Sequence, residues 1–332
     1  MSTIVRKVEA IISPVYEVGG SLRDELRGVD PLDYDFATPH RPEYIEERIR
    51  KAGRRPFLTG KRFGTIGVRI DGRLAEITTF RTETYREGNR SPDVSFVEGI
   101  TEDLARRDFT INAIARRDGL IIDPFGGRED LERHLIRCVG APGDRFREDP
   151  LRMLRAARFA GQLGFNVEED TFRALAKSSH RILQVSKERW MMEMDKLLKG
   201  DFTEKGLRIF MDSSLCCYMI PELSLQKDYD QNSRYHAYDL WEHTLRVVAA
   251  LPPDLHLRWA GLLHDIAKPF TRREKTDRST YVQHELLGYD MVRRLGTHLR
   301  WSKARLEEVS VLVRDHRKDG SPLKEADDGA KM

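Results

Sequence analysis

The stretch "VGGSLRDELRGVDPLDYDFATP" (residues 18–39) joins a glycine pair, a short helix-like segment and two aspartates, Asp33 and Asp35, one residue apart. Its second half is typical of a strand, and side chains alternate between the two faces of a strand. We therefore expect Asp33 and Asp35 on the same face. Two carboxylates held together repel each other unless a positive charge lies between them. The pattern indicates either a cation site or an acidic turn after Pro31.

The glycine pair, Gly19 and Gly20, precedes a short helix that we expect to start near Ser21. Glycine lets the backbone come close to an anion, and a helix N-terminus offers unpaired N–H groups to a phosphate. Paired carboxylates could hold divalent cations that bridge such phosphates. Glu76, on another predicted strand, is a candidate third carboxylate. Taken alone, the glycine pair is better explained by a tight turn.

Residues 1–138 alternate between strand-like and helix-like segments, which predicts a small mixed α/β domain. The predicted strands are "YEVGG" (16–20), "DYDFATP" (33–39), "GTIGVRI" (64–70) and "LAEITTF" (74–80), and the predicted helix is "EYIEERIRKAG" (43–53).

From about Glu148 onward, β-branched runs become rare and apolar residues recur at helical spacing, which predicts mainly helical structure. The polar stretch 220–238 indicates an irregular linker before a last helical unit that begins near Tyr235. We therefore expect an α+β fold. Its predicted domains are residues 1–138, a helical neck and body over 139–225, and a helical unit over 235–332.

The composition is that of a globular protein, with 332 residues of which 33% are charged. No apolar run approaches the roughly 20 residues needed to span a bilayer, and the N-terminus lacks the pattern of a signal peptide, so we expect no membrane association and a cytoplasmic location. The three cysteines suggest neither a disulfide framework nor a cysteine-based zinc site. Basic residues cluster in 41–62 and 145–158, which indicates either phosphate-binding patches or solvated helix faces.

Several motifs occur together in a fixed order along about the first 200 residues, and together they resemble the bacterial (class II) tRNA nucleotidyltransferases and poly(A) polymerases. The resemblance implies a head related to DNA polymerase beta, followed by helical neck and body regions. It also implies two-metal transfer of a nucleoside monophosphate from an NTP to an RNA 3′-hydroxyl. The motifs are "VGGSLRD", "DYDFAT", "GTIGV", "EITTFR", "EDLARRDFTINAIA", "DPFGG", "RFREDPLRMLRAARFAGQLGF" and "ERWMMEMDKLL".

The resemblance assigns roles to the motif residues of the head. It makes Asp33 and Asp35 the ligands of Mg²⁺ and Asp24 the support for the glycine turn. Glu76 stays the candidate third catalytic carboxylate on the ground of its strand position. Guanidinium groups suit phosphate oxygens, and a carboxylate can accept a hydrogen bond from a ribose 2′-hydroxyl. The residues implied to bind the ribose and phosphates are Gly19, Gly20, Arg23, Arg106, Arg107, Asp108 and Asn112.

In "REDPLRMLR", the same resemblance implies that Asp149 and Arg152 read the incoming base, with Glu148 orienting the arginine. A carboxylate accepts from the exocyclic amine of cytosine or adenine, and the guanidinium donates to the neighbouring ring acceptor, so the pair would select C and A over U and G. Arg155 and Arg158 on the same predicted helix are further candidates for nucleotide binding. In the competing interpretation, Asp149 is simply the N-cap of that helix.

The polar segment "ETYREGNRSPD" (83–93) reads as a loop and resembles the flexible loop that CCA-adding enzymes use when they switch from C to A. Relatives that add only CC shorten or lose this loop. Its presence therefore favours addition of complete CCA or of A.

The last predicted unit carries histidines and aspartates on separate helix-like segments, a combination that suits a transition metal. Their order resembles HD-domain phosphohydrolases, which some bacterial tRNA nucleotidyltransferases use on 2′-phosphates and 2′,3′-cyclic phosphates. A degenerate HD unit that acts only as a spacer is the alternative. The chain stops soon after this region, where relatives continue into a helical tail that grips tRNA. The implied ligands are His243, His264, Asp265 and Asp315, with His284 and His316 as further candidates.

The sequence as a whole predicts a Mg²⁺-dependent tRNA nucleotidyltransferase that adds C and A residues, from CTP and ATP, without a nucleic-acid template. It would bind the acceptor arm and 3′ end of tRNA through phosphate contacts and shape. An A-adding, CC-adding or poly(A) polymerase relative is the alternative within the class. An HD phosphohydrolase with an RNA-binding head is the alternative outside it.

Overall fold

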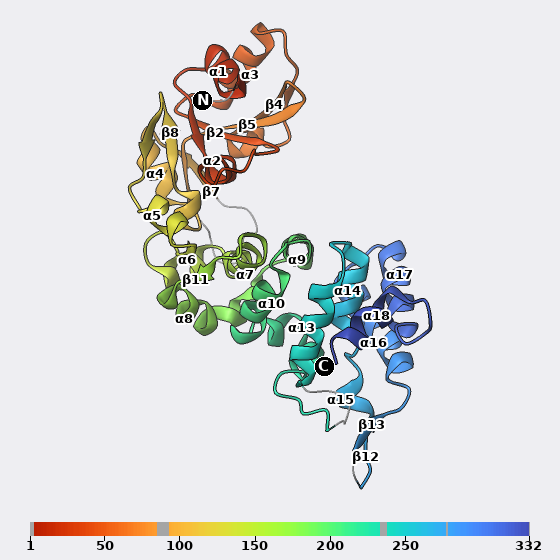
Figure 1. The fold of residues 1–332 in the computed structure, drawn as a ribbon. Coiled ribbons are helices and arrows are strands. Elements are labelled where there is room, and N and C mark those ends of the chain that lie inside the picture. Colours follow the sequence, from red (N-terminus) through yellow and green to blue (C-terminus); the bar gives the residue numbers. More distant parts are fainter. Residues whose placement is uncertain (1–2, 85–92, 233–237, 277, 332) are drawn as a thin grey trace. The chain divides into compact units, whose positions relative to one another are not determined.

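The computed structural model describes residues 3–84, 93–232, 238–276 and 278–331. The chain divides into two compact units, Met1–Asp149 and Pro150–Met332. The first is built on a mixed sheet and the second is mainly helical (Figure 1). The predicted α+β class is therefore confirmed.

A seven-stranded sheet with the order β3-β4-β5-β2-β1-β8-β9 forms the centre of the first unit. Strands β2 and β5 are parallel, and β1, β4 and β8 pair antiparallel with their neighbours. A separate two-stranded ribbon is formed by β6 (Arg81–Thr84) and β7 (Asp93–Phe96). The strands of the main sheet are β1 (Tyr16–Val18), β2 (Tyr34–Thr38), β3 (Pro56–Phe57), β4 (Thr65–Ile70), β5 (Arg73–Thr79), β8 (Ala115–Arg117) and β9 (Leu120–Ile122).

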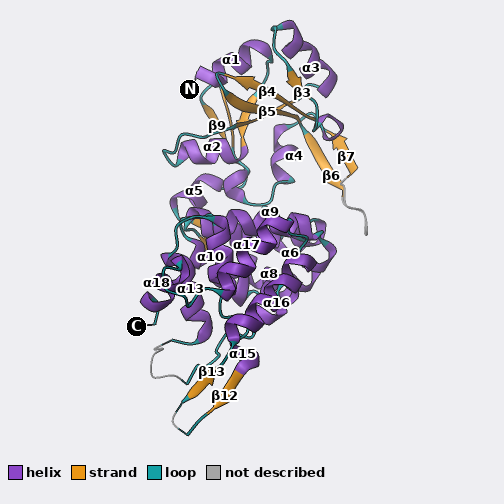
Figure 2. Cartoon of the chain, turned by 90° about the vertical axis from the view of Figure 1, so that its right-hand side faces the viewer, coloured by secondary structure: helices purple, strands orange, loops and turns teal. Residues whose placement is uncertain are grey.

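The alternation of side chains along β2 separates the core from the site. Tyr34 and Phe36 are buried in a cluster with residues of α1 (Thr3–Ile11) and α3 (Pro42–Lys51), which cover one face of the sheet (Figure 2). Ala37 packs on the other face with Val18 and with Leu104 of α4 (Ile100–Ala105). Asp35 has the parity of Ala37 and so lies on the face that α2 (Gly19–Leu26) covers.

Short elements complete the first unit. They include two 3₁₀ turns, of which η2 carries the predicted Asn112. The elements are η1 (Lys61–Phe63), η2 (Thr110–Asn112), α5 (Gly127–Glu132), β10 (Leu135–Ile136) and α6 (Pro142–Glu148).

In the second unit, α7 and α10 pack with their backbones in contact. A Cβ added at Gly206 would lie 2.7 Å from the carbonyl oxygen of Ala157, and one added at Gly200 would overlap the carbonyl of Gly161. Only glycine fits at such an approach. The elements of this part are α7 (Leu151–Leu163), β11 (Asn166–Val167), α8 (Glu169–Ser178), η3 (Ser179–Gln184), α9 (Lys187–Leu198), α10 (Thr203–Asp212), α11 (Leu215–Met219) and α12 (Pro221–Ser224).

The C-terminal part of the second unit is a group of helices with one small hairpin. Helix α12 begins inside the stretch predicted to be irregular, and the expected start near Tyr235 lies outside the described residues. Among the described helices, none is long and apolar enough to cross a membrane. The elements are α13 (Leu240–Ala250), α14 (Leu255–Leu263), α15 (Lys268–Thr271), β12 (Arg272–Glu274), β13 (Ser279–Tyr281), α16 (His284–His298), α17 (Lys303–Arg314) and α18 (Pro322–Gly329).

Candidate functional site

The acidic site of the first unit is built on two parallel strands. Asp35 of β2 lies directly beside Glu76 of β5 in the strand register. Burial raises the pKa of the Asp35 carboxyl, against the nearby Arg107 guanidinium, which lowers it. Burial also raises the pKa of Glu76, and the charges of Asp35 and Asp33 raise it further. The negative charges of the three carboxylates therefore repel one another, and a cation between them would relieve the repulsion.

Asp33 is placed differently from the prediction. It lies in an exposed bend just before β2 begins at Tyr34, not within the strand. Within the described ranges, the groups of metal-ligand atoms that lie within 4.8 Å of one another all belong to the second unit, so Asp33, Asp35 and Glu76 are not drawn together as tightly. The head carboxylates form an open arrangement.

The glycine pair brings the start of α2 against Asp35. Gly19 has a φ of +71°, and a Cβ there would lie 3.0 Å from Asp35 Oδ2 and 3.1 Å from Arg107 Nη1. The helix begins at Gly19 rather than near Ser21. The backbone N–H groups of Ser21 and Gly20 donate to the Asp35 carboxylate and lower its pKa. The backbone N–H of Asp35 in turn donates to Ser21 Oγ at 2.9 Å, so the turn and the strand hold each other.

Arg23 begins a chain of hydrogen bonds that joins α2 to η2. Its guanidinium donates to both carboxylate oxygens of Asp24, at 2.9 and 3.0 Å, and to Asn112 Oδ1 at 2.9 Å. Asn112 Nδ2 donates to Asp108 Oδ1 at 3.0 Å. The structure thus brings together three of the predicted nucleotide-site residues and the supporting Asp24.

Asp103, which the sequence interpretation missed, anchors the two adjacent arginines of this motif. Arg106 donates to its Oδ1 at 2.8 Å and Arg107 to its Oδ2 at 3.2 Å. The Asp103 side chain is buried, which would raise its pKa, but Arg107 and Arg106 hold the pKa below its usual value. The spacing of three and four residues from Asp103 to Arg106 and Arg107 along a helix was the signal that would have found it.

The predicted base-reading residues stand where α6 ends and α7 begins. Asp149 is extended (φ −137°, ψ 101°), and Pro150, which has helical angles, immediately precedes α7. Asp149 and Arg152 are both buried. Glu148, expected to orient Arg152, makes an ion pair with Arg145 on its own helix.

The other two predicted arginines of α7 face an acid from α9. Arg158 Nε lies 2.7 Å from Glu193 Oε2, and Arg155 Nη1 lies 3.9 Å from Glu193 Oε1. Arg158 and Glu193 are both buried. The ion pair fixes Arg158 in the helical packing of the second unit.

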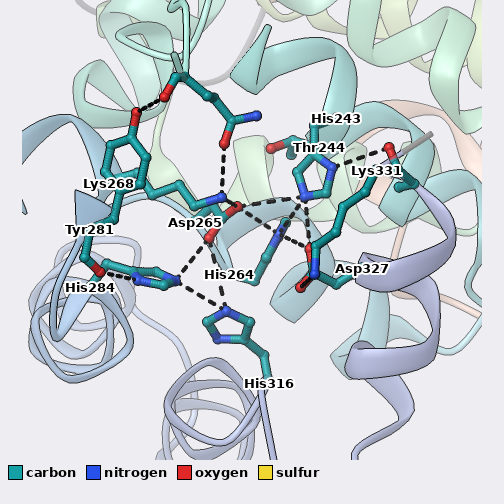
Figure 3. Close-up of polar contacts among 12 residues, drawn as sticks. His243, Thr244, His264, Asp265, Lys268, Tyr281, His284, His316, Asp327 and Lys331 are labelled. Carbon is teal, nitrogen blue, oxygen red and sulfur yellow. Dashed lines mark hydrogen bonds and ion pairs between the residues drawn. The ribbon is translucent and has the colours of Figure 1, made fainter. Parts of the chain in front are cut away.

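The second candidate site is a buried cluster at the ends of the C-terminal helices (Figure 3). His243 lies on α13, the pair His264 and Asp265 follows α14, and Asp327 lies on α18. His243 Nε2 lies 2.9 Å from Asp327 Oδ1, and His264 Nε2 lies 3.1 Å from Asp265 Oδ2. These residues form one group of potential metal ligands, and Asp265 with His284 and His316 forms another.

Backbone carbonyls orient all the imidazoles of this cluster. His264 Nδ1 lies 2.8 Å from the carbonyl oxygen of Gly261, and His284 Nδ1 lies 2.8 Å from that of Tyr281. His316 Nδ1 lies 2.6 Å from the carbonyl oxygen of Val313, and His243 Nδ1 lies 3.4 Å from that of Ala330. A carbonyl only accepts, so each Nδ1 that contacts one donates to it, and the Nε2 atoms of His243 and His264 face the carboxylates of Asp327 and Asp265.

Asp315 does not take the place that the sequence interpretation gave it. Its carboxylate pairs with Arg314 at 2.8 Å and Lys318 at 2.9 Å, and these contacts hold its pKa well below the usual range. Asp327, not Asp315, lies in the group with His243, His264 and Asp265 that could hold a metal ion. Its helix carries the buried Leu323 four residues earlier, so an acid on an apolar helix face was the available signal.

Lys268 supplies a positive charge beside the cluster. Its Nζ lies 2.6 Å from Asp265 Oδ2 and donates to Gln231 Oε1 at 2.9 Å. Burial, together with the neighbouring His264, lowers the pKa of His316 to about 4. A cavity of about 660 Å³ opens at the cluster, and its lining includes His284, His316 and the cationic side chains of Lys268, Arg278, Arg317 and Lys331. The lining also includes the carboxylates of Asp265, Glu285, Asp327 and Asp328, so its charges are mixed.

Comparison with protein families matches three segments of the chain. Residues 15–137 match the poly A polymerase head domain, and residues 164–226 match the probable RNA and SrmB-binding site of polymerase A. Residues 240–330 match the HD domain.

Similar proteins of known name are CCA-adding enzymes. The one from Geobacillus kaustophilus is 44% identical over 65% of this chain and 53% of its own length. The one from Geobacillus thermodenitrificans is 43% identical over 82% of this chain and 65% of its own length. A crystal structure of the Bacillus stearothermophilus CCA-adding enzyme in complex with CTP has a TM-score of 0.65 and 31% identity, covering 99% of this chain and 82% of that one. The match to the Geobacillus kaustophilus protein thus covers about half of that relative.

Proposed function

Because this chain belongs to the family of the CCA-adding enzymes, we propose that it adds C and A residues to the 3′ end of tRNA from CTP and ATP. No nucleic-acid template is needed. The RNA 3′-hydroxyl oxygen forms a bond to the α-phosphorus while the bond to pyrophosphate breaks. A tRNA substrate would place the protein in the cytoplasm.

The donor set of the first unit fits the divalent cation that this chemistry requires. Asp33, Asp35 and Glu76 would hold Mg²⁺, whose bound form lowers the pKa of the attacking hydroxyl and neutralises the phosphates. Arg23 and Arg107 would bind phosphate oxygens through their guanidinium groups. Asp108, beside Asn112, would accept from the ribose 2′-hydroxyl.

We place base selection at Asp149 and Arg152. The acceptor and donor pattern of this pair suits cytosine and adenine and opposes uracil and guanine. We expect Arg152→Ala to reduce discrimination among the four NTPs. Expressed as a free energy, this loss should exceed the loss in the free energy of unfolding. Equal selectivity of the variant and the parent in single-nucleotide incorporation would refute the assignment.

One observation carries the proposal for the first unit. Asp35 and Glu76 lie in register on parallel strands, and Gly19 brings a helix start and Arg107 into contact with Asp35. Carboxylates, a helix start whose backbone can approach a phosphate, and a guanidinium therefore lie close together. A metal-bound triphosphate requires all three.

The experiment is extension of three tRNA transcripts that end before CCA, after C and after CC. Each is incubated with Mg²⁺ and with CTP, ATP or both, and products are resolved at single-nucleotide resolution. Growth of all three to one CCA end is the expected result. Stopping after CC, acting only on the CC end or running into an A tail would identify a CC-adding, A-adding or poly(A) relative. The loop predicted to decide between them lies mostly outside the described residues, at 85–92.

The buried cluster favours a second activity, metal-dependent hydrolysis of phosphate esters. Its side chains His243, His264, Asp265 and Asp327 fit a transition metal, and the adjoining cavity includes four basic side chains that could bind a phosphate. In the reaction, the oxygen of a water molecule bonds to phosphorus, the ester bond breaks and the leaving oxygen takes up the proton. A bound metal ion would supply a water of lowered pKa.

The test uses 2′,3′-cyclic AMP and 2′-AMP with Mn²⁺, Co²⁺ or Ni²⁺. We expect hydrolysis that is lost in His264→Ala and kept in His298→Ala, a histidine at the far end of α16. Absence of hydrolysis with every metal would leave the cluster without this role.

A further inference from the structure

We infer that a groove in the second unit binds unpaired nucleotides of an RNA, with bases stacked on Phe270 and Tyr218. The groove has a volume of about 620 Å³, and its lining comes from α11, α12, α15 and α16. Its lining residues differ from those of the cavity at the histidine cluster. The inference rests on the proposed function in one respect, namely that RNA is the ligand of this protein.

The lining of this groove exposes large apolar side chains to solvent. Tyr218 is 39% exposed, Phe270 52% and Leu287 37%. Met291, about one turn after Leu287 on α16, continues the apolar lining. Single exposed apolar residues are common, but several that meet in one hollow are typical of a binding surface. The groove therefore offers apolar contacts that the fold itself leaves unused.

Two of these exposed side chains are aromatic rings from different elements. Tyr218 lies on α11 and Phe270 on α15, and both line the groove. The face of an exposed ring is a platform on which a nucleobase of any sequence can stack. Such stacking takes unpaired bases that are splayed out, as in single-stranded segments and loops of RNA. The rings therefore favour single-stranded RNA over a duplex.

Basic side chains accompany the apolar lining. Arg294 is exposed and lines the groove together with His298. Lys187 of α9 adds a second positive charge, because its Nζ lies 2.7 Å from His298 Nε2. Glu222 is the one acidic residue in the described lining. Arg294 and Lys187 therefore suit the phosphates of a strand whose bases lie against the rings.

One wall of the groove continues a segment that matches an RNA-binding family model. Tyr218 and Glu222 lie within residues 164–226, the part that matches this model. Phe270, Leu287 and Arg294 lie within residues 240–330, which match the HD domain. The inference thus extends the RNA-binding surface onto α15 and α16 of the HD segment.

The test measures binding of a fluorescein-labelled oligoadenylate of about twelve nucleotides, within the usual size of a single-strand site. Fluorescence anisotropy is recorded with the full chain and without NTP. We expect Phe270→Ala to weaken binding roughly 5-fold to 100-fold, because a stacked base is lost. Phe270→Leu keeps an apolar side chain without a ring and should weaken binding nearly as much. Phe270→Trp should retain binding.

Arg294→Gln tests the phosphate contact without changing the apolar lining. We expect weaker binding and a slope of log K against log salt that is smaller by about 0.7, the value for one phosphate contact on a single strand. Circular dichroism checks that each variant is folded. An oligonucleotide carrying 4-thiouridine, cross-linked with long-wave ultraviolet light and analysed by mass spectrometry, should attach to peptides that contain Tyr218 or Phe270.

Equal binding by the parent and Phe270→Ala would overturn the inference, as would no binding by the parent. Unchanged binding by Phe270→Leu would also overturn it, since the groove would then take an apolar partner such as an amphipathic peptide. Extension of tRNA transcripts by the same preparations separates the inference from the proposed function. Ring-dependent binding without nucleotide addition would keep the groove and remove the CCA-adding function. Nucleotide addition with binding that ignores the ring would do the reverse.

Discussion

The acidic site of the first unit and the histidine cluster of the second differ in how each would hold a metal. In the first unit, Asp33 is exposed in a bend, and Asp35 takes its hydrogen bonds from backbone N–H groups and lies near Arg107. In the second, the candidate ligands are buried, and the ligand atoms of each group lie within 4.8 Å of one another. An open carboxylate set suits Mg²⁺, which keeps waters and binds through substrate phosphates, whereas a closed imidazole set suits a tightly held transition metal. The comparison indicates that the nucleotide completes one site and the fold completes the other.

Removing each set of candidate ligands in turn is the most direct test of whether the two sites serve separate activities. We expect Asp33→Ala with Asp35→Ala to lower nucleotide incorporation by at least about 10³-fold, because transition-state charge is no longer stabilised. Phosphate-ester hydrolysis should remain. His264→Ala with Asp265→Ala should give the reverse pattern. Incorporation that survives the first pair would show that the metal assignment in the head is wrong.

Metal retention tests the same contrast without substitution. After transition-metal loading and gel filtration in metal-free buffer, we expect the cluster to keep its ions while incorporation falls at least roughly 100-fold and returns when Mg²⁺ is added. Metal analysis and primer extension on the same fractions give the result. Equal loss of metal from both sites would contradict the proposed difference in how tightly the two sites hold a metal.

Gly19 tests how closely the helix start must approach Asp35. We expect Gly19→Ala to reduce incorporation by roughly tenfold to 100-fold, since a Cβ at 3.0 Å displaces the Asp35 carboxylate. Gly28→Ala is the matched control. Gly28 also has a positive φ, +78°, but nothing lies within 4 Å of the added Cβ, so only backbone strain is introduced. Equal activity losses in the two variants would exclude the close approach as the cause.

Asp103 tests whether the arginines of the open site need an anchor. We expect Asp103→Asn to lower incorporation roughly tenfold through misplacement of Arg106 and Arg107 and to reduce the free energy of unfolding by about 1–3 kcal/mol.

The contribution of Asp103 to the free energy of unfolding depends on pH, and its lowered pKa fixes the direction of that dependence. The pKa of Asp103 is lower in the folded protein than in the unfolded chain, so its contribution is present above the unfolded value near 3.8 and is lost as the pH falls through the folded value. Urea unfolding of the parent and Asp103→Asn should therefore differ at pH 7 and converge in strong acid. A stability difference that grew as the pH fell would contradict the ion-pair account.

Much of the head could be predicted from local pattern, because alternation along 33–39 and 74–80 specifies β2 and β5. The start of α2 was misplaced because two glycines indicate a loop, whereas only Gly19 has a positive φ. Asp33 lies just outside the strand because strand ends depend on pairing, and the register pairs Tyr34 with Ala75 first.

The cluster ligands show where sequence patterns stop being informative. His264 and Asp265 are adjacent and were identified together, but the choice between Asp315 and Asp327 depends on how the chain returns after α17. Helix α18 packs against α13 and brings Asp327 to His243. That contact joins residues far apart in the sequence, and no periodicity encodes it.

The glycine contacts of α7 with α10 have a mechanical consequence. At Gly206, which lies against the backbone of α7 at Ala157, no side chain separates the two helices, so they cannot slide or rotate past each other there without a clash. The packing of α7 on α10 is therefore rigid, and the two helices move together. Thermal displacement of Arg152, on the first turn of α7, is then the displacement of a whole block of helices, which is smaller and slower than that of an arginine on a loosely packed helix.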